Sequence, residues 1–200
     1  MTTLQLNTSL FGPGGQSTTL ANEFVGRRGG NVIVRDLARD PVPHLDAARF
    51  GAFLAKPEAR TPEQQAVLDY SDALIAELRA ADTIVIGLPM YNFSIPSTLR
   101  AYFDHVARVG VTFKYTDKGP VGLLTGKKAY VFVTRGGVYG AEHIHTAYVR
   151  DFLAFLGITD VQFIYAEGLA ISPASKDAAL AKARETIERL TLNKPEFALT

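Results

Sequence analysis

Three short segments of this sequence combine glycine, hydroxyl and aromatic residues in a way that could bind a small anionic or planar molecule. Residues 8–17 read TSLFGPGGQS, residues 89–96 read PMYNFSIP, and residues 134–140 read TRGGVYG. Glycine lets a ligand approach the backbone, hydroxyls donate hydrogen bonds to phosphate, and aromatic rings cover flat surfaces. Together the segments predict a site for a ligand that has a phosphate and a ring system.

The first segment predicts a phosphate site, because unpaired N–H groups and the positive end of a helix dipole meet where a glycine-rich loop enters a helix. A nucleotide P-loop needs Lys before Ser or Thr, and no Lys occurs before position 56. A dinucleotide fingerprint needs glycine where Ser17 stands, so a dinucleotide is the second choice. The hydroxyls of Ser9, Ser17 and Thr18 favour a phosphomonoester, as in flavin mononucleotide (FMN). The structural alternative is that Ser17 only caps the helix.

The other two segments predict contacts to a planar ring. Tyr91 and Phe93 would expose apolar surface unless something flat covers them. The backbone N–H groups of Asn92, Phe93, Gly136 and Gly137 could stabilise negative charge on a reduced flavin. Arg135 could neutralise a flavin carbonyl or pair with a surface acid. Because the chemistry belongs to the cofactor, we expect no catalytic side chain.

Five apolar runs alternate with helical patterns, which predicts an α/β fold. The expected strands are Leu4–Thr8, Asn31–Asp36, Thr83–Pro89, Lys128–Thr134 and Val161–Glu167. Right-handed crossovers make a doubly wound, five-stranded parallel sheet in the order 2-1-3-4-5, with helices on both faces. In this order the loops after strands 1, 3 and 4 share one crevice, so the three segments should meet.

Helices are expected where apolar residues recur at helical spacing. Thr61 starts one, with proline next and Gln64 completing a capping box. A further helix carries Leu99, Tyr102, Phe103 and Val106, and Ser172-Pro173 opens the last one. Residues 37–60 and 110–127 are expected to be irregular.

Composition limits the remaining possibilities. Two hundred residues predict a single domain, 1–200, and 21 basic against 20 acidic residues argue against a nucleic-acid partner. No cysteine is present, and His143 and His145 lie two apart on a predicted helix, so we expect no metal site. Without a long apolar stretch or a leader-like start, we expect no membrane partner and a cytoplasmic location.

Several blocks resemble the FMN-dependent NADH azoreductases, also described as NADH:quinone oxidoreductases. They are Ser9 with Gln16-Ser17, residues 90–93 and 134–137, and the stretches 35–37, 107–113 and 155–160. The similarity spans nearly the whole chain. The chain departs from that family at Gly15 and Thr134, where Ser is frequent, and at Tyr139, where His is frequent.

The resemblance implies a flavodoxin-like homodimer with one FMN per subunit and sites at the subunit interface. It implies that NADH or NADPH reduces FMN, leaves, and is followed by a quinone or azo compound in a ping-pong reaction. The implied cofactor-binding residues are Ser9, Gly15, Gln16, Ser17, Met90, Tyr91, Asn92, Phe93, Thr134, Arg135, Gly136 and Gly137. Candidate substrate-binding residues are Phe93, Tyr115, Tyr139 and Phe155.

Two other classes stay open at this stage. A flavodoxin-type electron-transfer module would lack its own NAD(P)H turnover, and such carriers are usually strongly acidic, unlike this chain at +1. A flavin-free α/β protein with a regulatory or assembly role would not bind FMN at all.

Overall fold

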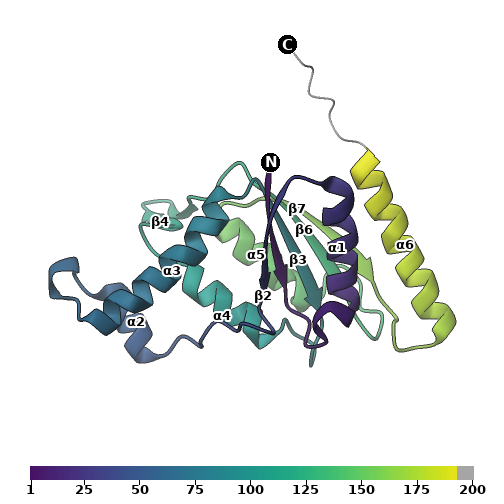
Figure 1. Ribbon diagram of the computed structural model, residues 1–200, viewed down its shortest axis with the longest axis horizontal. Coiled ribbons are helices and arrows are strands. Elements are labelled where there is room, and N and C mark those ends of the chain that lie inside the picture. The colour runs from purple at the N-terminus through teal and green to yellow at the C-terminus, as the bar shows by residue number, and fades with distance from the viewer. Residues whose placement is uncertain (193–200) are drawn as a thin grey trace, which may run out of the picture.

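The computed structural model describes residues 1–192 and contains one large parallel sheet (Figure 1). Its strands lie in the order β2-β1-β3-β6-β7, which is the expected order 2-1-3-4-5 once a separate hairpin is left out of the count. Residues 193–200 of the expected domain lie outside the described residues. The five strands are β1 (Thr2–Asn7), β2 (Asn31–Asp36), β3 (Thr83–Pro89), β6 (Lys128–Thr134) and β7 (Asp160–Ala166).

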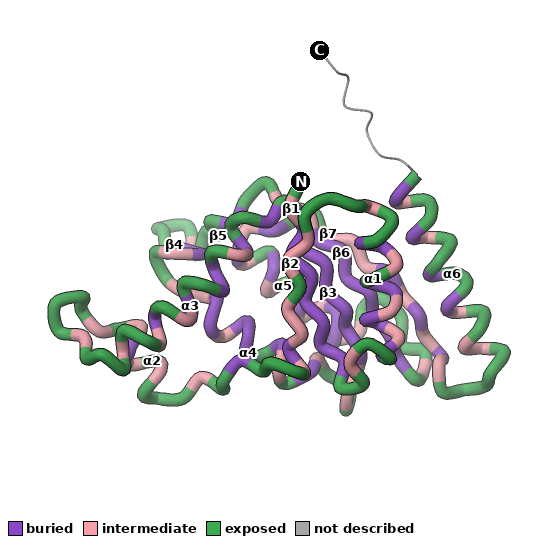
Figure 2. The backbone as a smooth tube through the Cα atoms, in the orientation of Figure 1, coloured by how far each residue is buried: buried purple, intermediate pink, exposed green. Residues whose placement is uncertain are grey.

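The central strands lie in the middle of the protein, as their unbroken apolar runs predict (Figure 2). Every residue of β3 is buried, and so is every residue of β6 after Lys128. Strands β3 and β6 pair in register to their last residues, Pro89 and Thr134. The loops that follow these two strands therefore start side by side at the carboxyl edge of the sheet.

Helices cover both faces of the sheet, as expected. On one face, α1 (Gln16–Arg28) and α6 (Pro173–Leu192) pack over side chains such as Val85 and Phe132. On the other, α3 (Pro62–Ala80), α4 (Ser97–Val106) and α5 (Ile144–Phe155) pack over side chains such as Ile84 and Val131. Adjacent strand residues thus face opposite cores, which is the alternation of a pleated strand.

The expected helix starts are confirmed. The Thr61 hydroxyl accepts from the Gln64 N–H, and the Gln64 side chain accepts from the Thr61 N–H, which forms the capping box. The apolar positions expected on α4, such as Leu99 and Val106, are buried, and α6 begins at Pro173.

Two expectations of irregular structure were wrong. Residues 37–60 contain α2 (Ala47–Leu54), which Asp46 caps by accepting from the Arg49 N–H, and a short 3₁₀ turn, η2 (Pro57–Ala59). Residues 110–127 contain an antiparallel hairpin of β4 (Phe113–Thr116) and β5 (Gly119–Gly122). Each of these helices and strands is eight residues or shorter, and so short a pattern gives little periodic signal.

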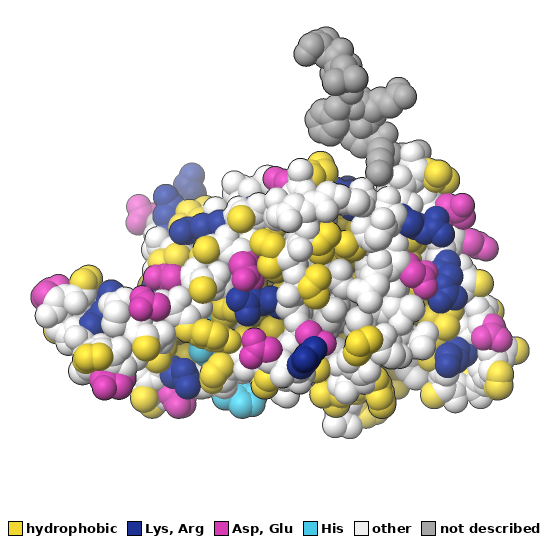
Figure 3. Space-filling view, in the orientation of Figure 1, with side chains coloured by type: hydrophobic (Ala, Val, Ile, Leu, Met, Phe, Trp, Pro, Cys, Tyr) yellow, Lys and Arg dark blue, Asp and Glu magenta, His cyan; other side chains and the backbone are white. Residues whose placement is uncertain are grey.

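The surface carries mixed charge. Lys and Arg side chains are interspersed with Asp and Glu on the face in Figure 3, in keeping with the formal net charge of +1. Among the described residues, no helix combines the length and apolar character that a membrane crossing requires.

One glycine sets how closely α1 approaches the sheet. A Cβ built on Gly87 of β3 would lie 3.1 Å from the Ser17 carbonyl oxygen and 3.4 Å from the Thr18 nitrogen. The first turn of α1 therefore rests directly on the backbone of a central strand. The Thr8 hydroxyl donates to the Gly87 carbonyl at 2.7 Å, which fixes the end of β1 at the same place.

We predict that Gly87→Val pushes the start of α1 away from β3 and lowers the free energy of unfolding by about 1–3 kcal/mol, as overpacking does. The control is Gly26→Ala on the same helix, where an added Cβ meets open space. Urea unfolding of both variants measures the effect. Equal stability of Gly87→Val and the parent protein would contradict this account.

Candidate functional site

The carboxyl edge of the sheet brings the three predicted segments together around one cleft of about 170 Å³. Loops after β1, β3 and β6 form its walls, and the loop after β7 adds Leu169. Phe11, Pro89 and Leu169 are lining residues that the sequence did not single out. The cleft is lined by Ser9, Phe11, Gln16, Pro89, Met90, Tyr91, Thr134, Arg135, Gly136 and Leu169.

The first N–H groups of α1 have no hydrogen-bond partner among residues 1–192. The helix follows a 3₁₀ turn, η1 (Gly12–Gly14), and its N-cap is Gly15, which has no side chain to cap with. The Ser17 hydroxyl is fully buried, and neither it nor the Thr18 hydroxyl has a hydrogen-bond partner within residues 1–192. Ser17 is therefore not the helix cap, and the capping alternative is wrong.

A tyrosine hydroxyl joins the first two loops. The Tyr91 hydroxyl accepts from the Leu10 N–H at 3.0 Å and lies 3.4 Å from the Ser9 hydroxyl. The Ser9 hydroxyl also accepts from the Phe11 N–H at 3.3 Å. Tyr91 therefore links the loop after β1 to the loop after β3.

The loop after β3 turns through two residues with left-handed backbone. Asn92 has φ of 50° and Phe93 has φ of 65°, and Tyr91 and Ser94 close the turn with two backbone hydrogen bonds. Such a φ is rare for a bulky residue such as Phe, so the turn is strained. Phe93 is 63% exposed and meets Tyr139 edge to face at 6.1 Å. Two of the candidate substrate-binding residues are thus in contact.

Four backbone N–H groups near the cleft have no partner in the part of the chain that the structure describes. They belong to Asn92, Phe93, Gly136 and Gly137, the residues expected to donate to the ring. The carbonyls of Gly136 and Gly137, by contrast, accept from the loop after β7. The backbone of these glycines is held in place while its donors stay available.

Arg135 borders the cleft, but its guanidinium bonds to the protein. It donates to the Glu167 carboxylate at 2.8 Å, the Gly140 carbonyl at 2.7 Å and the Thr146 hydroxyl at 3.1 Å. Its side chain is fully buried, and the partner acid is the largely buried Glu167 at the loop after β7, not a surface acid. The Arg135 guanidinium therefore orders the loop.

Glu167 completes the closure of that loop. Its Oε1 accepts from the Tyr139 N–H at 2.9 Å and the Gly140 N–H at 3.1 Å, besides Arg135. Burial would raise the pKa of Glu167, but these hydrogen bonds and the Arg135 charge lower it overall. The carboxylate stays ionised at neutral pH and holds residues 135–140 in one shape.

His145 is buried at the start of α5 and contacts both strand ends. Its Nδ1 accepts from Arg135 Nε at 3.3 Å, and its Nε2 lies 3.2 Å from the Pro89 carbonyl, to which a neutral ring donates. Burial and the Arg135 charge lower the pKa of His145 to about 4. From the sequence, His145 is considered only as a possible metal ligand. No local sequence pattern indicates the structural role of either His145 or Glu167.

In the folded chain, two of the candidate substrate-binding residues, Tyr115 and Phe155, lie far from the cleft. Tyr115 is on the β4–β5 hairpin, which lies in Figure 1 near the amino end of the strands. Phe155 ends α5 and packs on Phe113 with ring centroids 4.3 Å apart. Phe155 lies at the opposite edge of the sheet, because α5 starts at the cleft and runs away from it. Tyr115 lies at the same edge, because both residues pack on Phe113.

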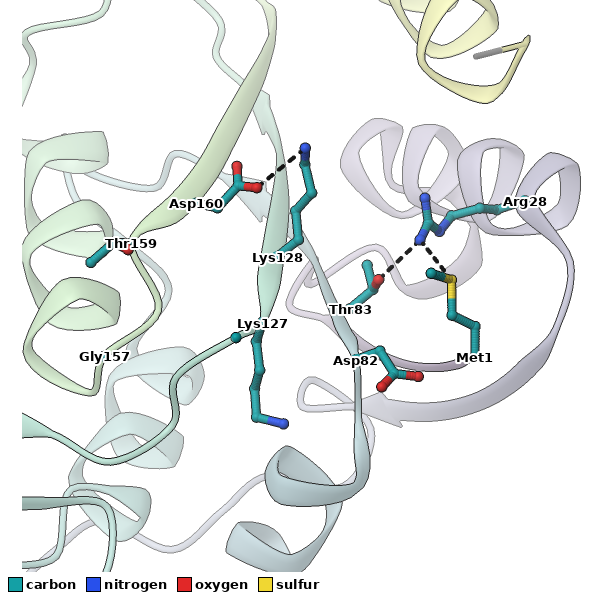
Figure 4. Close-up of a pocket in the computed structure, with 10 residues that line it drawn as sticks. Met1, Arg28, Asp82, Thr83, Lys127, Lys128, Gly157, Thr159 and Asp160 are labelled. Atoms are coloured by element: carbon teal, nitrogen blue, oxygen red, sulfur yellow. Dashed lines mark hydrogen bonds and ion pairs between the residues drawn. The ribbon is translucent and has the colours of Figure 1, made fainter. Parts of the chain in front are cut away.

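A larger cavity of about 600 Å³ lies at that opposite edge (Figure 4). Its charged side chains bond to protein groups: Arg28 donates to the Thr83 hydroxyl, and Lys128 pairs with Asp160 at 3.3 Å. Lys127 donates to backbone carbonyls of residues 79 and 81. Since these charges are already paired, the cavity offers fewer free groups to a ligand than the cleft does.

The cleft can therefore bind an anion at the start of α1 and a flat, electron-rich ring beside the two free pairs of N–H groups. Unpaired amides near a ring favour the form of the ring that carries more negative charge. The arrangement supplies polar contacts and orientation. It suits chemistry carried by a bound ring system.

Comparison with known proteins finds relatives that match nearly the whole chain. The Flavodoxin_2 family model, described as a flavodoxin-like fold, matches residues 1–190. The FMN-dependent NADH:quinone oxidoreductase of Cellvibrio japonicus is 55% identical over 195 residues, covering 94% of this chain and 97% of that protein. FMN-dependent NADH:quinone oxidoreductase 6 of Burkholderia lata is 53% identical over 193 residues, covering 93% and 98%.

Solved structures with the same fold are also found. The FMN-dependent NADH-azoreductase of Bacillus anthracis in complex with FMN has a TM-score of 0.82 and 29% identity, covering 95% of this chain and 99% of that one. A second azoreductase of Bacillus anthracis has a TM-score of 0.86 at 24% identity, covering 96% and 98%, which supports the fold.

We predict that His145 makes the protein less stable in acid. A ring whose pKa is about 4 when folded and near 6.5 when unfolded takes up a proton on unfolding between those values, so stability falls as pH drops from 6.5 to 4. Relative to His145→Gln, the loss should approach about 1.4 kcal/mol per pH unit at most. Urea unfolding across this range measures it. His105, whose pKa is also lowered by burial, is present in both proteins, so its contribution cancels in the comparison. Parallel curves of unfolding free energy against pH for the parent protein and His145→Gln would contradict the prediction.

Proposed function

This chain belongs to the Flavodoxin_2 family, and from that premise we propose that it is an FMN-dependent oxidoreductase acting in the cytoplasm as one functional domain. It takes electrons from NADH or NADPH and reduces quinones and aromatic azo compounds. NADH gives up a hydride, and a quinone gains two electrons and two protons, one of them from solvent. Cleavage of an azo bond to two amines consumes two such rounds. The relatives at 55% and 53% identity, named FMN-dependent NADH:quinone oxidoreductases, support this activity.

The residues at the start of α1 fit the phosphate of FMN. A fully buried Ser17 hydroxyl without a partner is costly unless a ligand accepts from it. The uncapped N–H groups of the first turn add donors and the positive end of the helix dipole. We assign the phosphate to Ser9, Gln16, Ser17 and the backbone of Gly15.

The loops after β3 and β6 fit the ring. We assign the isoalloxazine and ribityl to residues 90–93 and the pyrimidine side to residues 134–137. The free N–H groups of Asn92, Phe93, Gly136 and Gly137 are the single observation that carries this assignment. These residues are exposed or half-buried, so water can occupy their donors in the free protein, and a ring seated in the cleft would replace that water.

When bound, FMN accepts two electrons from a nicotinamide and passes them to the acceptor. The protein positions the ring, and its unpaired N–H groups stabilise the negative charge that the ring gains. Phe93 and Tyr139 provide an aromatic wall on which a flat nicotinamide, quinone or azo compound can stack. A single wall of this kind favours one substrate at a time, which supports a ping-pong sequence.

Tyr115 and Phe155 contribute to substrate binding only if a second copy of the chain brings them there. Tyr115 is 70% exposed on a hairpin, although tyrosine is rich in apolar surface. We propose a homodimer in which this hairpin end of one subunit approaches the cleft of its partner.

The activity is tested with purified protein reconstituted with FMN. We expect a yellow complex that oxidises NADH and reduces a soluble quinone without any added protein. A complex that accepts electrons only from a protein reductase would indicate an electron-transfer module instead. A colourless protein that does not take up FMN would refute the assignment of the cleft.

We predict that Ser17→Ala weakens FMN binding by about 1 kcal/mol, or about fivefold in Kd, because one hydrogen bond to the phosphate is lost. Fluorescence titration of apoprotein with FMN measures this. Ser71→Ala, which removes another buried hydroxyl on the distant α3, is the matched control. Unchanged affinity after substitution of Ser9, Gln16 and Ser17 would disprove the phosphate assignment.

We predict that sedimentation finds two chains per particle and that Tyr115→Ala lowers quinone turnover while leaving FMN affinity nearly unchanged. Val34→Ala, which removes a similarly exposed apolar side chain from β2, should leave turnover unaltered. A monomer with full activity would rule out a shared site.

A further inference from the structure

The two loops that offer free N–H groups to the ring leave adjacent strands and then part. The last backbone bond between them joins the Met90 N–H to the Thr134 carbonyl at 2.9 Å. Beyond that bond, the strained turn at Asn92 and Phe93 closes on itself, and the glycine loop closes on residues of the loop after β7. Backbone pairing fixes where the loops start, and beyond it side chains, among them Phe93 against Tyr139, also set their relative position.

His145 is placed to join the two loops. Its Nε2 contacts the carbonyl of Pro89, the residue just before the first loop, and its Nδ1 contacts Arg135, the residue just before the two glycines. The ring is 1% exposed, so neither bond competes with water. Both ring nitrogens of the neutral side chain are used, one as donor and one as acceptor.

The chain of contacts continues from Arg135 to the far side of the glycine loop. Arg135 donates to the Gly140 carbonyl and to Glu167, and Glu167 accepts from two N–H groups of the same loop. A displacement of His145 would therefore shift Arg135, and with it residues 135–140, which the bonds of Arg135 and Glu167 hold together. The charged or titratable groups facing the ring are Arg135, just after β6, and His143 at the N-cap of α5.

We propose that His145 is a positioning residue for the flavin: by tying Pro89 to Arg135 it sets the spacing between the two pairs of N–H donors, and with it the affinity and reduction potential of bound FMN. The inference rests on the proposed function. A fixed spacing matters most for the reduced ring, because hydrogen bonds to a charged acceptor are stronger and more sensitive to geometry.

Three substitutions separate the two bonds. His145→Gln carries an amide long enough to donate to the Pro89 carbonyl and accept from Arg135, so it can keep the link; His145→Asn retains only an acceptor near Arg135, and His145→Phe removes both. We expect the Kd of FMN to rise about tenfold in the Phe and Asn variants and to stay within about threefold in the Gln variant. If the reduced cofactor is weakened tenfold more than the oxidised one, the two-electron potential falls by about 30 mV.

The control is Val149→Ala, a buried position one turn further along the same helix, which lowers stability without touching either loop. Equal Kd and potential in His145→Phe and the parent protein would overturn the inference, as would a loss in the Gln variant as large as in the Asn variant. A loss of FMN affinity in Val149→Ala as large as that in His145→Phe would also overturn it. A parent protein that binds no FMN would instead refute the proposed function, and the inference with it.

Discussion

Backbone N–H groups with no partner in the described part of the chain, gathered at one edge of the sheet, are the constraint on which the rest of this structure depends. Parallel strands end together, so the loops after β1, β3 and β6 converge there. Other polar groups near this edge, such as the Thr8 hydroxyl and the Arg135 guanidinium, are paired, whereas the Ser17 and Thr18 hydroxyls have no partner within residues 1–192. The donors of Asn92, Phe93, Gly136 and Gly137 lie on exposed or half-buried loop residues, where water serves them until a ligand accepts from them.

The sequence predicted the strand order and the three loops because both depend on local signals. Apolar runs mark strands, and Gly136 and Gly137 mark a close approach whatever the surroundings. The roles of Arg135, His145 and Glu167 could not be predicted in the same way. Their bonds join residues 10 and 32 positions apart, and no spacing rule relates positions that meet only after the sheet has formed.

The same limit explains the misassigned segments. Residues 47–54 and the β4–β5 hairpin are too short to show a period, and their stability comes from contacts made elsewhere. A Cβ on Gly122 would lie 2.0 Å from the Gly157 nitrogen, so the hairpin packs backbone to backbone on the end of α5. Only the folded chain brings these two glycines together.

The departures from the resembled family acquire a physical meaning in the folded chain. A Cβ on Gly15 would lie 2.1 Å from the Ser9 hydroxyl, so Gly15 leaves the space that the Ser9 side chain fills. The two positions are coupled: a serine at 15 would require Ser9 to take another position, and with it the Tyr91 link between the loops. Tyr139 stands against Phe93 and extends the aromatic wall, where histidine would add a titratable ring. The loop chemistry of this chain therefore favours contact through hydroxyls, amides and aromatic faces over contact through charge.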